Sequence, residues 1–232
     1  MAHVIAIANQ KGGVGKTTTA INLGASLAVA EKRTLVLDID PQGNATSGLG
    51  VESHSSHPTI YNVLIGQNEL REAVVPDVHF PFLSVVPSTR DLVGAEIELV
   101  SALSRETILR QALEPLRDDY DYILMDCPPS LGLLTINTLT AADSVLIPIQ
   151  CEFYALEGLS QLLNTVRLVQ RGLNPALEVE GVLLTMFDKR LNLSRQVSEE
   201  AREYFGPKVY RSAIPRNVRL AEAPSFGQPI VL

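Results

Sequence analysis

The segment QKGGVGKTT, residues 10–18, decides the fold of this chain. It follows a short apolar run at 4–8 and opens a stretch of good helix formers at 17–30, the strand–loop–helix context in which a phosphate-binding loop is credible. Glycines at 12, 13 and 15 let the backbone turn its N–H groups inward and approach phosphate oxygens closely. The segment therefore predicts a site for the phosphates of a nucleotide.

Two lysines and a threonine give this loop its chemistry. We expect Lys16 to reach the β- and γ-phosphates, and the Thr17 hydroxyl to bind Mg²⁺. The usual pattern G-x-x-x-x-G-K-[ST] is not met, because position 10 is Gln, and a second lysine stands at position 11. Beside phosphate, a second cation can neutralise charge that develops on the transferred group. The expected nucleotide contacts are Lys11, Gly12, Gly13, Val14, Gly15, Lys16, Thr17 and Thr18.

Carboxylates follow two further apolar runs. The run at 34–38 ends in Asp38 and continues to Asp40, and a period of two places both side chains on the same side of the chain. That position is the sheet edge where nucleotides bind in open α/β folds. The run at 122–126 ends in Asp126, which we expect to support Mg²⁺ through a water. Pro128 and Pro129 predict a stiff exit from this strand, suited to a switch that senses the γ-phosphate.

Apolar β-branched runs alternate with segments of helical period along the whole chain. This pattern predicts an α/β fold, with a mainly parallel twisted sheet and helices on both faces, as one doubly wound domain over residues 1–232. We expect strands at 4–8, 34–38, 83–86, 122–126, 144–149 and 179–185. We expect helices at 17–30, 90–98, 106–116, 133–141, 155–171 and 194–204.

The formal net charge of −7 conceals a basic segment. Residues 189–219 hold eight basic and three acidic side chains, so the segment carries +5 and the remainder −12. A local basic face on an acidic body is compatible with DNA binding confined to one surface. Cys127 and Cys151 show no metal-site spacing, the four histidines show no ligand arrangement, and no signal peptide or membrane-spanning run is found. We therefore expect a reduced, cytoplasmic protein.

The chain resembles the deviant phosphate-loop ATPases, the class that contains ParA/Soj, MinD and the nitrogenase iron protein. The resemblance covers almost the whole chain, and within this class the chain is most similar to the ParA/Soj branch. The stretches that carry it are DIDPQGNATSGLG (38–50), GAEIELV (94–100), DCPPSLGLLTINTLTAAD (126–143), QCEFYALEGLSQLLNTV (150–166) and IPRNVRLAEAPSFGQPI (214–230).

The resemblance implies roles for individual residues. Lys11 would reach across an ATP-sandwiched dimer to the partner's nucleotide, Asp40 would orient the attacking water, and Asp38 would sit near the metal and the lysines. Pro215 and Asn217 would neighbour the adenine. Arg190 and Arg219 match DNA-binding positions, and Arg216 fits either nucleotide or DNA.

The implied activity is weak ATP hydrolysis that works as a switch. MgATP would produce a homodimer that binds double-stranded DNA non-specifically and associates with the nucleoid. No membrane partner is expected. A ParB-type DNA-binding protein would stimulate hydrolysis during chromosome or plasmid partition. Family members usually continue past residue 230 with a charged segment and a closing helix, which residues 1–232 lack.

Three alternatives stay open at the level of sequence. A MinD-type ATPase would use the same switch to bind membrane through a C-terminal amphipathic helix. A redox protein like the nitrogenase iron protein would use Cys127 and Cys151 for an iron–sulfur cluster. A metabolic kinase or ligase would share the phosphate loop, although no signature of an acceptor substrate is visible.

Overall fold

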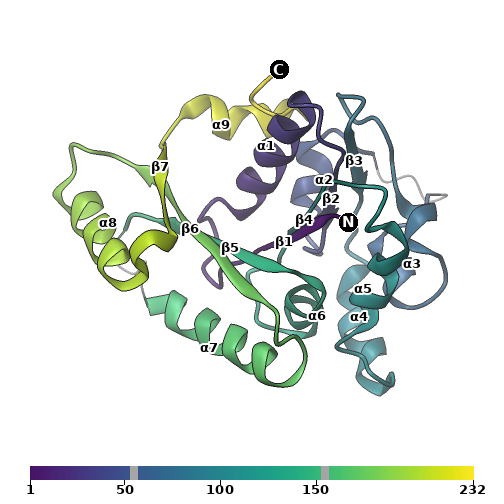
Figure 1. Ribbon diagram of the computed structural model, residues 1–232. Coiled ribbons are helices and arrows are strands. Elements are labelled where there is room, and N and C mark those ends of the chain that lie inside the picture. The colour runs from purple at the N-terminus through teal and green to yellow at the C-terminus, as the bar shows by residue number, and fades with distance from the viewer. Residues whose placement is uncertain (53–56, 153–156) are drawn as a thin grey trace.

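A seven-stranded parallel sheet forms the centre of the computed structural model, which describes residues 1–52, 57–152 and 157–232 (Figure 1). The strand order is β3-β2-β4-β1-β5-β6-β7, and every neighbouring pair runs parallel. The predicted α/β class is confirmed. The strands are β1 (His3–Ile7), β2 (Thr34–Asp38), β3 (Leu83–Val86), β4 (Tyr122–Asp126), β5 (Ser144–Gln150), β6 (Glu178–Phe187) and β7 (Val209–Pro215).

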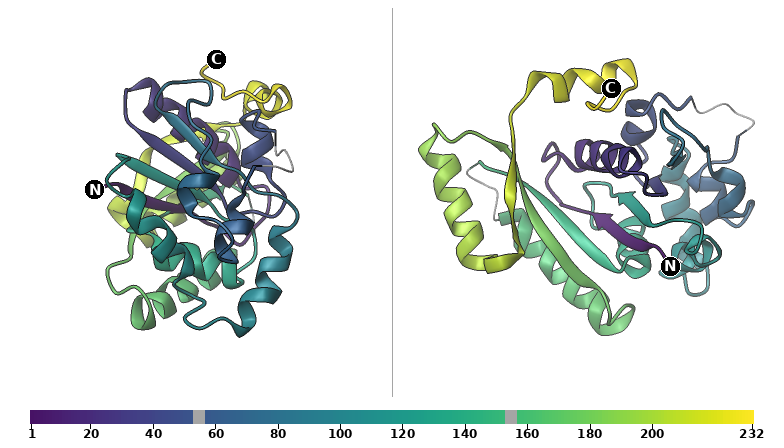
Figure 2. Two further views of the ribbon diagram at one scale, coloured as in Figure 1. Left: turned by 90° about the vertical axis from the view of Figure 1, so that its right-hand side faces the viewer. Right: turned by 45° about the horizontal axis from the view of Figure 1, so that its top comes forward.

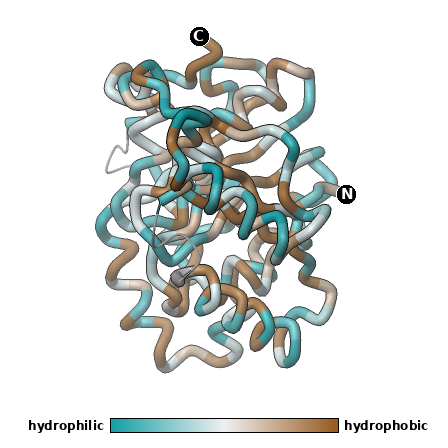
Figure 3. The backbone as a smooth tube through the Cα atoms, turned by 90° about the vertical axis from the view of Figure 1, so that its left-hand side faces the viewer, coloured by the Kyte–Doolittle hydropathy of each residue, from teal (hydrophilic) through white to brown (hydrophobic). Residues whose placement is uncertain are grey.

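Helices cover both faces of this sheet (Figure 2). Val4 and Ala6 of β1 belong to one buried cluster, whereas Ile5 and Ile7 belong to a second cluster that includes residues of α1 and α2. Apolar side chains on both sides of the strand exclude water from both faces. Along the covering helices, hydrophobic and hydrophilic residues alternate (Figure 3). The α-helices are α1 (Lys16–Val29), α2 (Asn44–Gly48), α3 (Ile60–Leu64), α4 (Leu92–Glu98), α5 (Ile108–Leu113), α6 (Leu133–Ala141), α7 (Glu157–Gly172), α8 (Asn192–Phe205) and α9 (Val218–Glu222).

Several boundaries differ from the sequence-based prediction. The first strand lies at His3–Ile7 rather than 4–8. The helix predicted at 106–116 is shorter, because α5 ends at Leu113 and Pro115 continues it only as a 3₁₀ turn. Residues 155 and 156 of the helix predicted at 155–171 lie outside the described residues, and α7 continues to Gly172. None of the described helices has the length and apolar character needed to cross a membrane.

The strand order brings the carboxylates to one edge of the sheet. In the parallel register, Asp126 of β4 lies opposite both Asp38 of β2 and Ile7 of β1. The loop that follows β1 therefore begins beside Asp126, and Asp38 lies one strand further along the sheet. This juxtaposition at the carboxyl ends of the strands is where open α/β sheets bind their ligands.

A junction at His79 ties the end of the chain to the region after β2. Nε2 of His79 lies 3.0 Å from the carbonyl oxygen of Leu49 and 2.8 Å from that of Gly227. Both partners can only accept, so Nε2 carries the proton. Gly50 and Gly227 both have positive φ, and a Cβ on Gly227 would lie 2.7 Å from the Cα of Gly50. The two backbones touch because neither residue has a side chain.

We expect Gly227→Ala to lower the free energy of unfolding by about 2–4 kcal/mol, since it adds a backbone clash to the cost of a left-handed alanine. Gly66→Ala is the matched control, because Gly66 has φ +76° and open space around its Cβ position. The control loses only about 1 kcal/mol. Urea unfolding at equilibrium measures both, and equal losses in the two variants would show that the contact with Gly50 is unimportant.

Candidate nucleotide site

The loop between β1 and α1 has the backbone geometry of an anion cradle. Gly13 and Gly15 have φ of 72° and 90°, which residues with a Cβ rarely adopt. The loop leads directly into α1, whose first-turn N–H groups have no partners within the helix. Two of the three predicted glycines, Gly13 and Gly15, thus have the left-handed backbone that is common in anion-binding loops.

Neighbouring strands hold this loop in place. The hydroxyl of Thr185, on β6, donates to the carbonyl oxygen of Val14 at 2.8 Å. The side chain of Asn9 donates to the carbonyl oxygen of Pro148 on β5 at 2.7 Å and accepts from the backbone N–H of Lys11 at 3.0 Å. Asn9 and Thr185 are buried. These hydrogen bonds anchor the loop to β5 and β6 without any ligand, and such anchoring lowers the entropic cost of binding.

Lys16 lies inside the site rather than in solvent. Its side chain is buried, and Nζ donates to the carbonyl oxygen of Lys11 at 3.3 Å. Burial lowers the pKa of Lys16, and the nearby carboxylates of Asp126 and Asp40 oppose this shift. A buried cation whose bond to the loop is long is ready to exchange that bond for a phosphate oxygen.

Asp126 is the group that most clearly lacks a partner. It is fully buried, and within the described residues neither carboxylate oxygen has a hydrogen-bond partner of standard geometry. Burial, and then the charge of Asp38, raise the pKa of Asp126 well above the usual carboxyl range, while the nearby Thr17 hydroxyl opposes the shift. A carboxylate beside a threonine hydroxyl is the oxygen donor set that Mg²⁺ prefers. The residues present therefore fit the metal ion that the sequence predicts.

Asp38 is occupied, in contrast to Asp126. Its Oδ2 accepts from the backbone N–H of Thr46 at 2.8 Å and from the Thr46 hydroxyl at 2.7 Å, and its Oδ1 accepts from the N–H of Asp40 at 3.1 Å. Burial raises the pKa of Asp38 to about 6, and these hydrogen bonds oppose the shift. Asp38 lies opposite Asp126 in the sheet register. Its oxygens, however, are already used within the chain.

We expect Asp126→Asn to raise the free energy of unfolding by about 1–2 kcal/mol in nucleotide-free, magnesium-free buffer. The substitution removes a carboxyl group whose ionised form is disfavoured by burial and by the charge of Asp38. Asp143→Asn is the control, because Asp143 accepts from Arg117 at 2.6 Å and from the Val4 N–H at 2.8 Å. The control is expected to lose about 1–3 kcal/mol. A loss of stability in both variants would contradict our description of Asp126.

Glu152 brings the loop and the C-terminal part of the chain together. Its carboxylate lies 3.8 Å from Nζ of Lys11 and 3.6 Å from Nη2 of Arg216. All three side chains are partly exposed. Lys11 therefore stands at the outer rim of the loop while Lys16 lies inside. Arg216 and Lys11 thus approach the same carboxylate.

The other residues predicted for adenine and DNA follow the ends of β6 and β7. Pro215 ends β7 opposite Phe187 of β6. Asn217 caps α9, because its side chain accepts from the backbone N–H of Arg219 at 2.9 Å. Arg190 makes a two-pronged pair with Asp188 and remains exposed. The two strand ends are neighbours, so Arg190 and Arg219 emerge from the same edge of the sheet as the phosphate loop.

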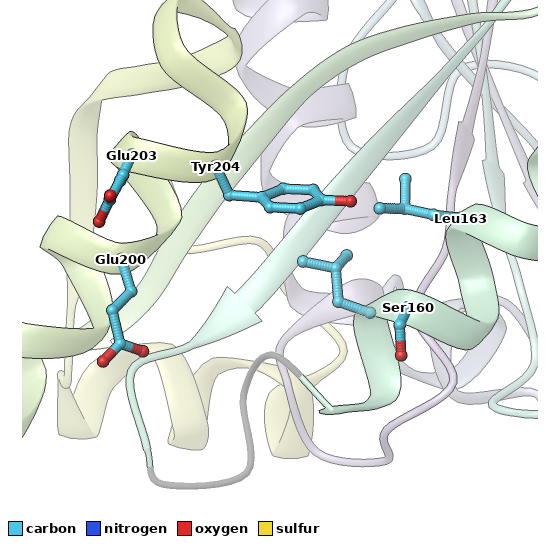
Figure 4. Close-up of a pocket in the computed structure, with 6 residues that line it drawn as sticks. Ser160, Leu163, Glu200, Glu203 and Tyr204 are labelled. Carbon is cyan, nitrogen blue, oxygen red and sulfur yellow. The ribbon is translucent and has the colours of Figure 1, made fainter.

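Buried thiols and a separate groove lie outside this chemistry. Cys127 and Cys151 are buried and unpaired with each other, and burial raises the pKa of Cys127 to about 12. A groove of about 480 Å³ lies between α7 and α8 (Figure 4). Leu163 and Tyr204 point toward one another across it. No residue predicted for the nucleotide site is among those described as lining this groove.

The sequence did not single out Asn9, Thr46, Glu152 or Thr185 as part of the site. Each contacts a partner that is distant in sequence or uses a buried hydroxyl. A single residue of these types forms no sequence motif from which its role could be predicted. The one available signal was position, since Asn9, Glu152 and Thr185 each stand just after or at the end of a predicted strand.

Comparisons with known proteins find relatives along the whole length of this chain. Residues 2–179 match a protein-family model described as an AAA domain. The chromosome partitioning protein ParA of Myxococcus xanthus is 60% identical over 232 residues, covering 100% of this chain and 82% of that protein. The sporulation initiation inhibitor protein Soj of Bacillus subtilis is 61% identical, covering 100% of this chain and 91% of that protein.

A solved structure with nucleotide and metal has the same fold. The cobyrinic acid a,c-diamide synthase from Mycobacterium smegmatis has been crystallised with ADP and magnesium, and with an ATP analogue and magnesium. It superposes with a TM-score of 0.87 at 39% sequence identity, over 98% of this chain and 93% of that one.

Proposed function

Because this chain belongs to the ParA/Soj family of P-loop ATPases, we propose that it is an ATP-dependent dimerising switch for chromosome or plasmid partition. In this proposal, MgATP joins two copies, the dimer binds double-stranded DNA non-specifically, and slow hydrolysis returns the monomer. A DNA-bound partner of the ParB type stimulates that hydrolysis. The protein then works in the cytoplasm and joins the nucleoid while ATP is bound.

The observation that carries the proposal is the presence of a buried lysine, Lys16, and a buried carboxyl group, Asp126, next to each other at the phosphate loop. Lys16 and Asp126 have no other evident use, since the Lys16 bond to the loop is long and Asp126 has no partner of standard geometry among the described residues. Lys16 and the N–H groups of the loop bind the phosphates, and Thr17 and Asp126 hold Mg²⁺, Asp126 through a water. Bound magnesium neutralises charge that develops on the phosphate oxygens.

The hydrolytic step needs little covalent chemistry from the protein. Asp40 positions the attacking water, with its own carboxylate held by the backbone N–H of Gln42 at 2.9 Å. Lys11, on the rim, approaches the nucleotide of the partner copy and balances the charge that moves toward the leaving group. Positioning and charge balance supply most of the acceleration in phosphoryl transfer.

DNA binding in this proposal depends on two copies of one basic edge. Arg190 and Arg219 are exposed, and a single copy offers only weak contacts with DNA phosphates. Doubling the edge in the dimer makes the second contact intramolecular, which raises avidity without a new contact. We assign Pro215 and Asn217 to the adenine and keep Arg216, beside Lys11, near the nucleotide.

Sedimentation with long duplex DNA tests this proposal, with ATP, ADP or no nucleotide. We expect ATP-dependent, salt-sensitive binding that Arg219→Glu abolishes. Arg211→Glu is the matched control, since Arg211 is an exposed arginine of the same basic segment and should weaken binding much less. A parallel sedimentation with anionic liposomes addresses the MinD-type alternative. Binding to liposomes but not to DNA would overturn the proposal.

A further inference from the structure

Thr46 connects three segments at the nucleotide edge. Its hydroxyl donates to Oδ2 of Asp38 at 2.7 Å and accepts from the backbone N–H of Ser88 at 2.9 Å. Its own N–H donates to the same Asp38 oxygen at 2.8 Å. Thr46 is on α2, Asp38 ends β2, and Ser88 follows β3. All three residues are almost completely buried, so water does not compete for these bonds.

The bonds of Thr46 reach Asp40 through a single carboxylate. Asp38 uses Oδ2 for Thr46 and Oδ1 for the backbone N–H of Asp40 at 3.1 Å. The carbonyl oxygen of Asp40 accepts from the N–H of Gly43 at 2.9 Å, just before α2 begins. The backbone of Asp40 is therefore fixed on both sides, and Asp38 serves as the bridge.

We infer that Thr46 is a positioning residue for hydrolysis, which orients Asp38 and thereby places the Asp40 carboxylate. The inference rests on the proposed function, in which Asp40 orients the attacking water. A carboxylate that accepts only one hydrogen bond can rotate about its Cβ–Cγ bond, whereas the two bonds from Thr46 and the one from Asp40 fix its plane. Small misplacements of a reacting group cost large factors in rate, so the fixed plane matters for turnover.

The hydroxyl of Thr46 is also the partner of a buried backbone group. Without it, the N–H of Ser88 would lose its acceptor, and Asp38 would lose one of two donors on Oδ2. Valine has nearly the shape of threonine and keeps the backbone N–H, so Thr46→Val removes only these hydroxyl bonds. Serine keeps the hydroxyl and removes only a methyl group.

The test compares single-turnover hydrolysis and nucleotide affinity in Thr46→Val, Thr46→Ser and Asp40→Ala. We expect Thr46→Val to lower the rate at saturating MgATP about tenfold to a hundredfold while the dissociation constant for a fluorescent ATP analogue changes less than about threefold. Thr46→Ser should keep the wild-type rate within about threefold. Ser47→Ala is the control on the same helix, because among the described residues the exposed Ser47 hydroxyl donates to carbonyl oxygens of its own turn.

The arms separate failure of the inference from failure of the proposed function. An unchanged rate in Thr46→Val, with Asp40→Ala inactive, would overturn the inference and leave the role of Asp40 standing. Parallel loss of affinity and rate in Thr46→Val would also overturn it, since that is the result of a purely structural role. An active Asp40→Ala would instead defeat the proposed hydrolytic role, and the inference with it. If thermal unfolding shows that Thr46→Val does not fold, Thr46→Ala takes its place under the same criteria.

Discussion

Asp40→Ala is expected to lower the rate of ATP hydrolysis by about a hundredfold or more while MgATP binding persists. Asp40 is almost fully buried at the nucleotide edge, and its carboxylate is held by the Gln42 N–H. In the proposed function, the phosphates bind elsewhere, through Lys16 and the loop. The substitution thus removes a group used for the water and leaves the groups used for the nucleotide. Phosphate release under single-turnover conditions measures the rate, and equilibrium binding of a fluorescent ATP analogue measures affinity.

This variant also reports on the switch. An ATP-bound protein that cannot hydrolyse should accumulate as a dimer and remain on DNA after excess ADP is added. Asp91→Ala is a suitable control, because Asp91 is an exposed aspartate near the end of β3 that lies outside the predicted site. Wild-type turnover by Asp40→Ala would show that another group activates the water.

Lys16→Gln is expected to weaken MgATP binding about a hundredfold. The glutamine keeps much of the length but cannot neutralise phosphate, and the carboxylates of Asp126 and Asp40 then face the nucleotide without a buried cation between them. The loop itself is held by Asn9 and Thr185 and keeps its shape. Isothermal titration with ATP, with and without Mg²⁺, measures the loss.

The control for Lys16→Gln is Lys32→Gln, at an exposed lysine after α1. It should bind MgATP as the wild type does. If both variants bind equally well, the buried position of Lys16 has no part in nucleotide binding. If Lys16→Gln fails to fold, nucleotide-free thermal unfolding shows it, and Lys16→Arg, which keeps the charge, distinguishes folding from binding.

Much of this architecture was predictable from sequence, because it depends on local pattern. Buried strands such as β2 (Thr34–Asp38) and β4 (Tyr122–Asp126) are continuous apolar runs, and their predicted bounds are confirmed. The edge strand β7 was missed, because VYRSAIP mixes exposed and buried positions and pairs on one side only. The five-residue helices α2, α3 and α9 were missed since they are too short for a helical period to appear.

The site shows the same division between local pattern and distant contact. Lys16, Asp38 and Asp126 were predicted from loop spacing and strand ends, and the register places Asp126 next to the end of β1 and Asp38 next to Asp126. The bonds of Thr46 were not predictable, because Asp38 and Ser88 meet it only after β2 and β3 pair. The same holds for Glu152, which joins Lys11 to Arg216 across 205 positions of the chain. The contacts of Glu152 depend on the order of the strands in the sheet.

Helix α2 stands between two parts of the molecule to which we give different tasks. One of its residues, Thr46, is bonded to Asp38 at the nucleotide edge, and the segment just after it, at Gly50, touches Gly227 in the part of the chain that follows α9. A change in the position of α2 would therefore alter both the contact with Asp38 and the contact with Gly227. If ATP strengthens DNA binding as proposed, thermodynamic linkage makes the coupling reciprocal, and DNA would strengthen ATP binding by the same factor. Nucleoid DNA would then regulate the nucleotide site in addition to being the surface that the protein binds.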